Sequence, residues 1–221
     1  MKKMLVIIVI LAMILVSMII YKNIAINKNK SVNVQEVEQI EEYISKIYMW
    51  KEITKEALPT FENINNANEL WVWEVIKKNL ETYETTYEEI QQKGKELFGE
   101  KFEKQIPKEG NDSFYYDKES NKYLATEIVL DEEEDSFLLK DIEKEGEKYK
   151  VKIIEYIEDY SEENKVIIRN LQEEEIGRVS TSDSETKIKE IVKKNKERFS
   201  QKNIEIKKEK DNLVIEKVNK E

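Results

Sequence analysis

Hydrophobic and polar residues divide this chain into one continuous apolar run and a longer region with short-period patterns. Residues 4–21 read MLVIIVILAMILVSMIIY, in which Ser17 is the only clearly polar side chain. As a helix this run is about 27 Å long, close to a hydrocarbon thickness of about 30 Å, and it has no polar face to present to water. The pattern predicts a membrane-spanning helix, with residues 1–21 as the anchor.

Two interpretations of the apolar run remain open. Lys2 and Lys3 precede it, as in a cleaved secretory signal, and cleavage would release a soluble secreted domain. The run continues through Ile19, Ile20 and Tyr21 without a small-x-small cleavage site, which favours an uncleaved anchor. Lysines flank both ends in similar numbers, but a short tail before a terminal span is typical of a signal-anchor. We therefore expect a cytoplasmic N-terminus and a domain outside the cytoplasm.

Helical spacing dominates the segment 34–110, after a short polar tether at residues 22–33. Each of three predicted helices begins at Asn or Thr with Glu three residues later, a capping-box pattern. The first is expected to end near Leu58, because Pro59 disfavours helical geometry in the residue before it. The third is expected to stop at Gly99. The start motifs are Asn33 with Glu36, Asn66 with Glu69, and Thr86 with Glu89.

The hydrophobic period changes after residue 110. Short runs rich in Tyr, Ile, Val, Phe and Leu alternate with polar turns, which predicts strands, and the short gaps favour antiparallel hairpins. One further helix, capped by Ser182 and Glu185, is expected before a last hairpin that turns at residues 210–212. The predicted strands are residues 113–117, 123–130, 136–142, 149–157, 166–171, 203–207 and 213–218.

This element order predicts an α+β domain in which helices pack on one face of a curved antiparallel sheet. Segment 111–221 forms the sheet with one inserted helix, and we expect residues 34–221 to be one folded unit. The order of elements over about residues 35–221 is similar to that of the cystatin-like and nuclear-transport-factor-like cone folds. The resemblance implies a concave pocket between sheet and helices, and it implies no activity.

Composition excludes several kinds of chemistry. The chain has Cys 0 and His 0, so disulfides, thiol nucleophiles, Ser–His–Asp triads and His-containing metal sites are ruled out. No phosphate-binding glycine motif occurs, and we expect no cofactor. The net charge of −10 argues against a nucleic-acid partner. Residues 187–221 are basic, which is typical of a solvated surface and would also suit anionic lipid or cell-wall polymers.

Adjacent carboxylates at residues 131–135, reading DEEED, form the most conspicuous charged motif. Carboxylates attract hard cations such as calcium. The run lacks the alternating acid spacing and the glycine of an EF-hand loop, and it lies between two apolar runs. We therefore expect a solvated hairpin turn and no metal site, and we interpret residues 173–175 in the same way.

Glu155 is the catalytic candidate. Strict alternation along its strand puts Glu155 on an apolar face, where burial would raise its pKa, as in a general acid or base. A bulge at Ile153 and Ile154 would instead turn Glu155 outward and place Ile154 and Tyr156 inward. We expect the bulge or an edge position, because an unpaired buried carboxylate is costly.

Aromatic side chains are the ligand-binding candidates, since they can line a cleft for a sugar or peptide. At helix and strand spacing they more commonly belong to a core. Trp71 and Trp73 lie about 200° apart around their helix, so we do not expect both in the same core. The candidates are Trp71, Tyr115, Tyr116, Tyr123 and Tyr156.

The sequence therefore predicts a single-pass membrane protein with a non-catalytic domain outside the cytoplasm. The domain is expected to bind a protein, a peptide or a cell-envelope component, and residues 4–21 contact the membrane. The alternative is a pocket enzyme, a hydrolase or isomerase, that uses carboxylates and tyrosines around Glu155. An outward Glu155 with no second acid nearby would count against the enzyme.

Overall fold

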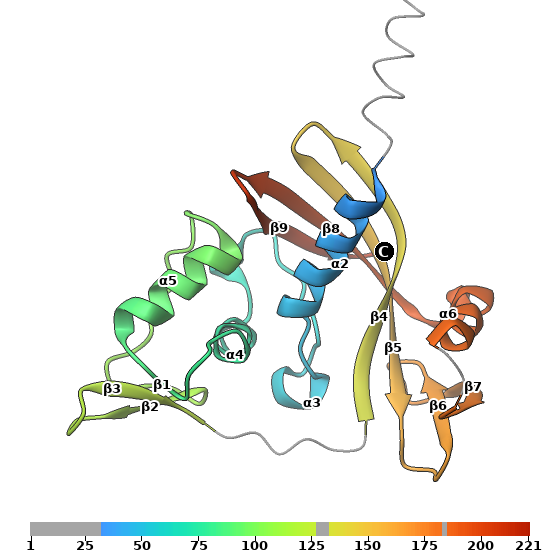
Figure 1. The fold of residues 1–221 in the computed structure, drawn as a ribbon, viewed down its shortest axis with the longest axis horizontal. Helices are drawn as coiled ribbons and strands as arrows, with labels where there is room; N and C mark the ends of the chain where they lie inside the picture. The colour runs from blue at the N-terminus through green and yellow to red at the C-terminus, as the bar shows by residue number, and fades with distance from the viewer. Residues whose placement is uncertain (1–31, 127–132, 183–184) are drawn as a thin grey trace, which may run out of the picture.

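The computed structural model describes residues 32–126, 133–182 and 185–221 (Figure 1). The predicted anchor at residues 1–21 and the tether up to residue 31 lie outside these ranges. Within the described ranges, no helix combines the length and apolar character needed to cross a membrane. The fold is an α+β arrangement of helices and antiparallel sheets, as predicted.

The first predicted helix is two helices, α2 (Val34–Ile47) and α3 (Lys51–Thr54). The Asn33–Glu36 capping box that starts α2 is confirmed, with both reciprocal hydrogen bonds present. The expectation that this helix continues to Leu58 is wrong. Tyr48 is extended, and the chain turns back so that the Met49 N–H donates to the Ala57 carbonyl. Tertiary burial of this turn therefore ends the helix well before Pro59 can restrict it.

The second predicted helix is α4 (Glu69–Lys78), which follows the short 3₁₀ helix η1 (Ile64–Asn66). Its N-cap is Asn68, which accepts from the Trp71 N–H, so the predicted start at Asn66 is wrong by two residues. The prediction that Trp71 and Trp73 cannot share a core is also wrong, because both are buried in the same apolar cluster. Residues 71–76 are buried all around α4, so opposite sides of this helix meet the same core.

The third predicted helix is α5 (Tyr87–Phe98), and its start and stop are confirmed. Thr86 and Glu89 form a complete capping box, and Gly99 ends the helix at φ 88°, a conformation that favours glycine. Beside α5 lies a small antiparallel sheet in the order β1-β3-β2. The single predicted sheet is therefore two sheets. The strands of the small one are β1 (Glu84–Thr85), β2 (Phe114–Asp117) and β3 (Lys122–Ala125).

The larger sheet is antiparallel and has the order β7-β6-β5-β8-β9 (Figure 1). Strand β4 pairs along one side of β5, and on the other side β8 pairs with residues 148–155 and β6 with residues 157–159. Strand β7 was not predicted, while the last hairpin, β8–β9, is confirmed. The predicted fourth helix is α6, followed by the 3₁₀ helix η2. The bounds are β4 (Glu133–Glu145), β5 (Lys148–Asp159), β6 (Lys165–Arg169), β7 (Glu175–Ser180), α6 (Glu185–Lys194), η2 (Lys196–Arg198), β8 (Ser200–Glu209) and β9 (Asn212–Lys220).

Strand β5 is buried on both faces, because helices cover both sides of the large sheet. Val151 and Ile153 belong to the main core with α2, α4 and α5, whereas Ile154 and Tyr156 join a second cluster with α6. Figure 1 shows α6 on the opposite side of β5 from α2. The expectation that helices pack on one face only is therefore incomplete, since α6 forms its own layer.

Candidate functional site

Glu155 faces the main core in a strand paired on both sides, so the expected bulge or edge position is wrong. Strand β5 pairs with β4 and β8 without a shift at Ile153–Ile154, and the irregularity lies in β4 between Leu139 and Asp141. The cost of burying a carboxylate is offset by a partner that the sequence reasoning missed. The Lys202 Nζ lies 3.1 Å from Glu155 Oε1, with side-chain exposures of 3% and 1%.

The strand register brings these two charges together. Ile153 pairs with Lys202 and Glu155 pairs with Ser200, so Glu155 and Lys202 are diagonal neighbours on adjacent strands. Both occupy core-facing positions of alternating strands. The alternation of Lys202 with Ile204 and Ile206 was a signal available in the sequence.

Tyr48 connects this buried pair to the surface. Its hydroxyl lies 3.3 Å from Glu155 Oε1 and 3.3 Å from the Ser136 carbonyl oxygen, while Lys202 also donates to the Leu58 carbonyl. Burial, and then the Glu155 charge, raise the pKa of Tyr48 well above its ordinary value. Tyr48 therefore serves as a hydrogen-bond donor, and Glu155 is held by a lysine and a tyrosine.

A hollow of about 310 Å³, here called the β4 groove, lies on the other side of Tyr48. Its floor is residues 134–137 of β4, and its walls come from the end of α2, from Lys78 of α4 and from α6. The aromatic side chains in its wall are Tyr48, Trp50, Phe137 and Tyr156, and the acidic ones are Glu41, Glu134, Asp135, Glu158 and Glu185.

The two lysines of the β4 groove are already engaged. Lys78 donates to the carbonyls of Ser45 at 3.0 Å and Tyr48 at 2.9 Å, and it lies over the Trp50 ring. Burial lowers the pKa of Lys78. Lys189 lies 2.6 Å from Glu185 and 3.8 Å from Glu41, which joins α6 to α2 at one end of the groove.

Asp135 is the most constrained acid of the groove. Its Oδ2 accepts from the Lys51 N–H at 2.6 Å, whereas its Oδ1 is buried without a hydrogen-bond partner in the described part of the chain. Burial raises the pKa of Asp135, and the charge of Glu155 adds to the effect. A second acid is thus electrostatically coupled to Glu155, although Glu155 does not itself line the groove.

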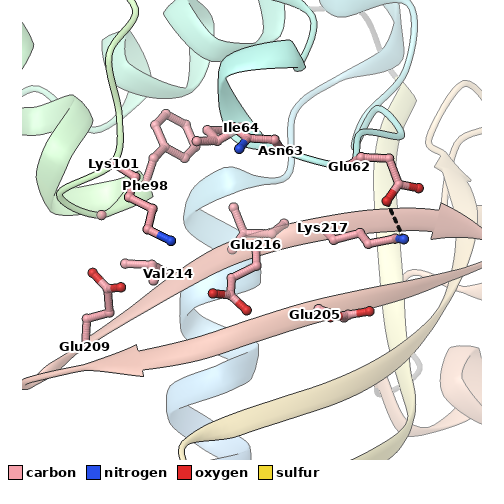
Figure 2. Close-up of a pocket in the computed structure, with 12 residues that line it drawn as sticks. Glu62, Asn63, Ile64, Phe98, Lys101, Glu205, Glu209, Val214, Glu216 and Lys217 are labelled. Carbon is pink, nitrogen blue, oxygen red and sulfur yellow. Dashed lines mark ion pairs between the residues drawn. The ribbon is translucent and has the colours of Figure 1, made fainter.

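A second hollow of about 260 Å³ lies where the end of α5 and residues 62–64 meet β8 and β9 (Figure 2). Figure 2 shows Phe98, Ile64 and Val214 with several charged side chains around it. Three of its four carboxylates have lysine partners, since Glu62 pairs with Lys217, Glu209 with Lys207 at 3.0 Å, and Glu216 with Lys148 at 2.6 Å. This compensated charge makes it a weaker candidate than the β4 groove.

The predicted aromatic residues do not gather in one cleft. Trp71 is 0% exposed and donates from its indole nitrogen to the Ile47 and Ala57 carbonyls. Tyr116 and Tyr123 lie together, with ring centroids 5.0 Å apart, whereas Tyr115 is 62% exposed. Tyr156 packs near Phe199 on the α6 side and is the member of the set that lines the β4 groove.

The two acidic runs, residues 131–135 and 173–175, lie in different structural settings. Residues 131–132 lie outside the described residues, whereas 133–135 begin β4, so the expected hairpin turn is wrong for these three residues. Each carboxylate of the second run has a basic neighbour: Glu173 lies 3.6 Å from Lys51, Glu174 2.6 Å from Arg198, and Glu175 2.7 Å from Arg178.

Comparison of the chain with known protein families, with curated proteins and with solved structures finds no match. The similarity in element order to the cone folds stays a prediction.

Proposed function

We propose that the chain is a membrane-anchored, non-catalytic domain outside the cytoplasm that binds a protein, a peptide or a cell-envelope component. The observation that carries the proposal is the β4 groove, which combines four aromatic side chains with acidic residues that outnumber its lysines. The buried Glu155, in contrast, is neutralised by Lys202. The groove thus offers chemistry for recognition on the surface, whereas the strongest catalytic candidate serves the core.

The location rests on the sequence. Residues 4–21 are long and apolar enough to span a bilayer, and the tether that follows is short. The domain would therefore stay close to the membrane surface, where envelope components and other membrane proteins are its neighbours. Protease added to intact cells should digest the domain. Protection in intact cells, with cleavage only after lysis, would reverse the orientation.

The binding role can be tested with a photoreactive phenylalanine placed at Phe137 in the full-length chain. Irradiation of intact cells should yield covalent adducts with one discrete protein or envelope polymer, because Phe137 lines the groove. Tyr115, exposed on the small sheet, is the matched control position. The same adducts from both positions, or none from Phe137, would contradict a binding role for the groove.

The enzyme remains the second candidate, favoured by the hydrogen bond from the Tyr48 hydroxyl to Glu155 beneath the groove. Chromogenic esters, amides and glycosides would be offered to the wild type and to the double variant Glu155→Leu/Lys202→Met, which replaces the ion pair with apolar side chains. Turnover by the wild type that disappears in the folded double variant would favour an enzyme over a binding domain.

A further inference from the structure

The outer edge of β4 is open at the floor of the groove. Strand β4 pairs with β5 along one side, and no described backbone group hydrogen-bonds to the backbone of its other side, although the Lys51 N–H donates to the Asp135 side chain. The Glu221 N–H donates to the Gln201 carbonyl on the β9 side, so Ile154, which pairs with Gln201, turns its backbone groups toward β4, and so does Tyr156. Ser136 pairs with Tyr156 and therefore faces β5, which leaves the backbone groups of Asp135 and Phe137 facing outward. In an antiparallel strand the N–H and C=O of one residue face the same side. Backbone groups of β4 are therefore available to an added strand.

The carboxylates along this edge have no close ion-pair partner among the described residues, although Lys78 and Lys189 are near enough for the charges of Glu134 and Glu158 to act on them. Glu134 and Glu158 are paired directly across β4 and β5, an arrangement of like charges that destabilises a sheet. No described lysine or arginine lies within 4.0 Å of the carboxylates of Glu134, Asp135 or Glu158, although Tyr160 donates to Glu158. The neighbouring pair, Glu133 with Asp159, differs because Arg169 lies 2.8 Å from Asp159. A cation would relieve the repulsion at Glu134 and Glu158.

Apolar surface lies beside these charges. The Tyr48 and Phe137 rings are 5.1 Å apart, and Trp50 and Tyr156 complete the aromatic part of the wall. Lysine and arginine have long aliphatic stems that pack on such surfaces while their charged ends reach carboxylates. The combination suits side chains that are cationic at the tip and apolar along the stem.

We propose that the β4 groove binds an extended, basic segment of a partner protein, which adds to the open edge of β4 as a further strand. The inference rests on the proposed binding function and names its partner class. Acidic side chains on an edge strand also discourage pairing with other chains. They do so by repelling chains of the same charge, whereas a basic chain is attracted. Backbone hydrogen bonds would supply affinity, and the carboxylates would supply selectivity.

The test uses the full chain in nanodiscs of phosphatidylcholine, which has no net charge and does not attract a basic peptide. The probes are fluorescent peptides of alternating lysine and valine, the glutamate and valine counterpart, and the lysine peptide N-methylated at alternate residues. We expect saturable binding of the first peptide alone, and weaker binding as salt rises from about 0.05 M to about 0.5 M. Equal binding of the N-methylated peptide would overturn strand addition.

The decisive variant is Glu134→Gln/Glu158→Gln, with Glu81→Gln/Glu109→Gln as a control of equal net charge on exposed loops. One exposed ion pair changes an equilibrium by up to about fivefold. The groove variant removes two carboxylates, so it should bind the lysine peptide about tenfold more weakly. Because it also removes the like-charge pair, its melting temperature should rise by about 1–3 °C. The control should leave both quantities unchanged.

The outcomes separate the two proposals. Lysine-peptide binding that the groove variant does not weaken would overturn the basic partner. If the glutamate peptide binds equally well, the basic partner is also overturned. Adducts at Phe137 in cells would then still support a binding function. If Phe137 yields no adducts in cells while the lysine peptide binds as expected, the groove has the inferred chemistry and the proposed cellular role fails.

Discussion

At the scale of single residues, the ion pair of Glu155 and Lys202 places two opposite charges inside the main core. Both side chains are almost completely buried, and Glu155 Oε2 has no hydrogen-bond partner in the described ranges. Taking two charges out of water costs several kcal/mol per ion, and their attraction only partly returns it. Removing one partner of such a pair is costly, whereas replacing both partners with apolar side chains of similar size often leaves the stability unchanged or raises it.

The prediction is that removing one charge is worse than removing both. Glu155→Leu or Lys202→Met alone should lower the free energy of unfolding by about 3–5 kcal/mol, because an unpaired charge stays buried. The double variant should lie within about 1 kcal/mol of the wild type, or above it. Urea unfolding of all four proteins measures this. Losses that simply add in the double variant would contradict a coupled pair.

Asp135 makes a prediction about pH. Burial raises its folded-state pKa, so its deprotonation costs more in the folded state than in the unfolded chain. The resulting loss of stability is absent below its ordinary pKa of 3.8 and develops as pH rises through the folded-state value. Asp135→Asn should therefore be more stable than the wild type at pH 7, with the difference shrinking at acidic pH. Asp112→Asn, at an exposed position, is the control in thermal melts.

At the scale of elements, α4 and α5 depend on contacts from distant chain segments. The Trp71 ring lies 5.7 Å from both Phe61 and Phe98, and Trp73 lies 6.2 Å from Phe102. Phe102 comes from the loop after α5 and folds back onto that helix at Gly94. A β-carbon at Gly94 would overlap the Phe102 ring, so the glycine serves packing at the expense of helix propensity.

Gly94→Ala should therefore destabilise the domain. Alanine improves helix propensity by about 1 kcal/mol, but displacing a buried ring costs about 1–3 kcal/mol. A net loss in urea unfolding is expected, and it should shrink when Phe102→Leu gives the methyl group room. Gln92→Ala, two residues away on the exposed side, should change stability by less than about 0.5 kcal/mol. A more stable Gly94→Ala variant would contradict the contact.

At the scale of the whole molecule, both apolar cores are built within the described residues. The main core joins α2, α4 and α5 to the large sheet, and the second core joins α6 to β5, β6 and β7. The first of these core residues in the chain is Ile40, which lies beyond the predicted anchor and tether. The domain should therefore fold without the anchor.

Deletion of residues 1–21 should leave a folded, soluble domain that is absent from the membrane fraction. An apolar helix surrounded by lipid contributes no contact to the cores, so its removal deletes none. Circular dichroism and a cooperative thermal melt of the truncated protein test the first point, and fractionation of cells tests the second. An aggregated or molten product would mean that the apolar segment packs in the domain.

Features that depend on a few neighbouring residues could be predicted from the sequence. The capping boxes at Asn33 and Thr86 and the turn at Gly99 involve residues at most a few positions apart. Alternation in β5 and the hairpin of β8 and β9 likewise follow from local spacing and short turns. The lack of cysteine and histidine in the chain excludes whole classes of chemistry by composition alone.

Other features depend on which distant segments meet, and tertiary packing established them. The break after α2 follows from a turn between Met49 and Ala57, and both faces of α4 are buried because other segments enclose it. Glu155 could be placed on its face by alternation, but its burial became tolerable only through Lys202 on another strand. The β4 groove arises in the same way, because α2, β4 and α6 contribute its walls from separate parts of the chain. Contacts of this kind are set by the free energy of packing the whole domain, which local spacing does not encode.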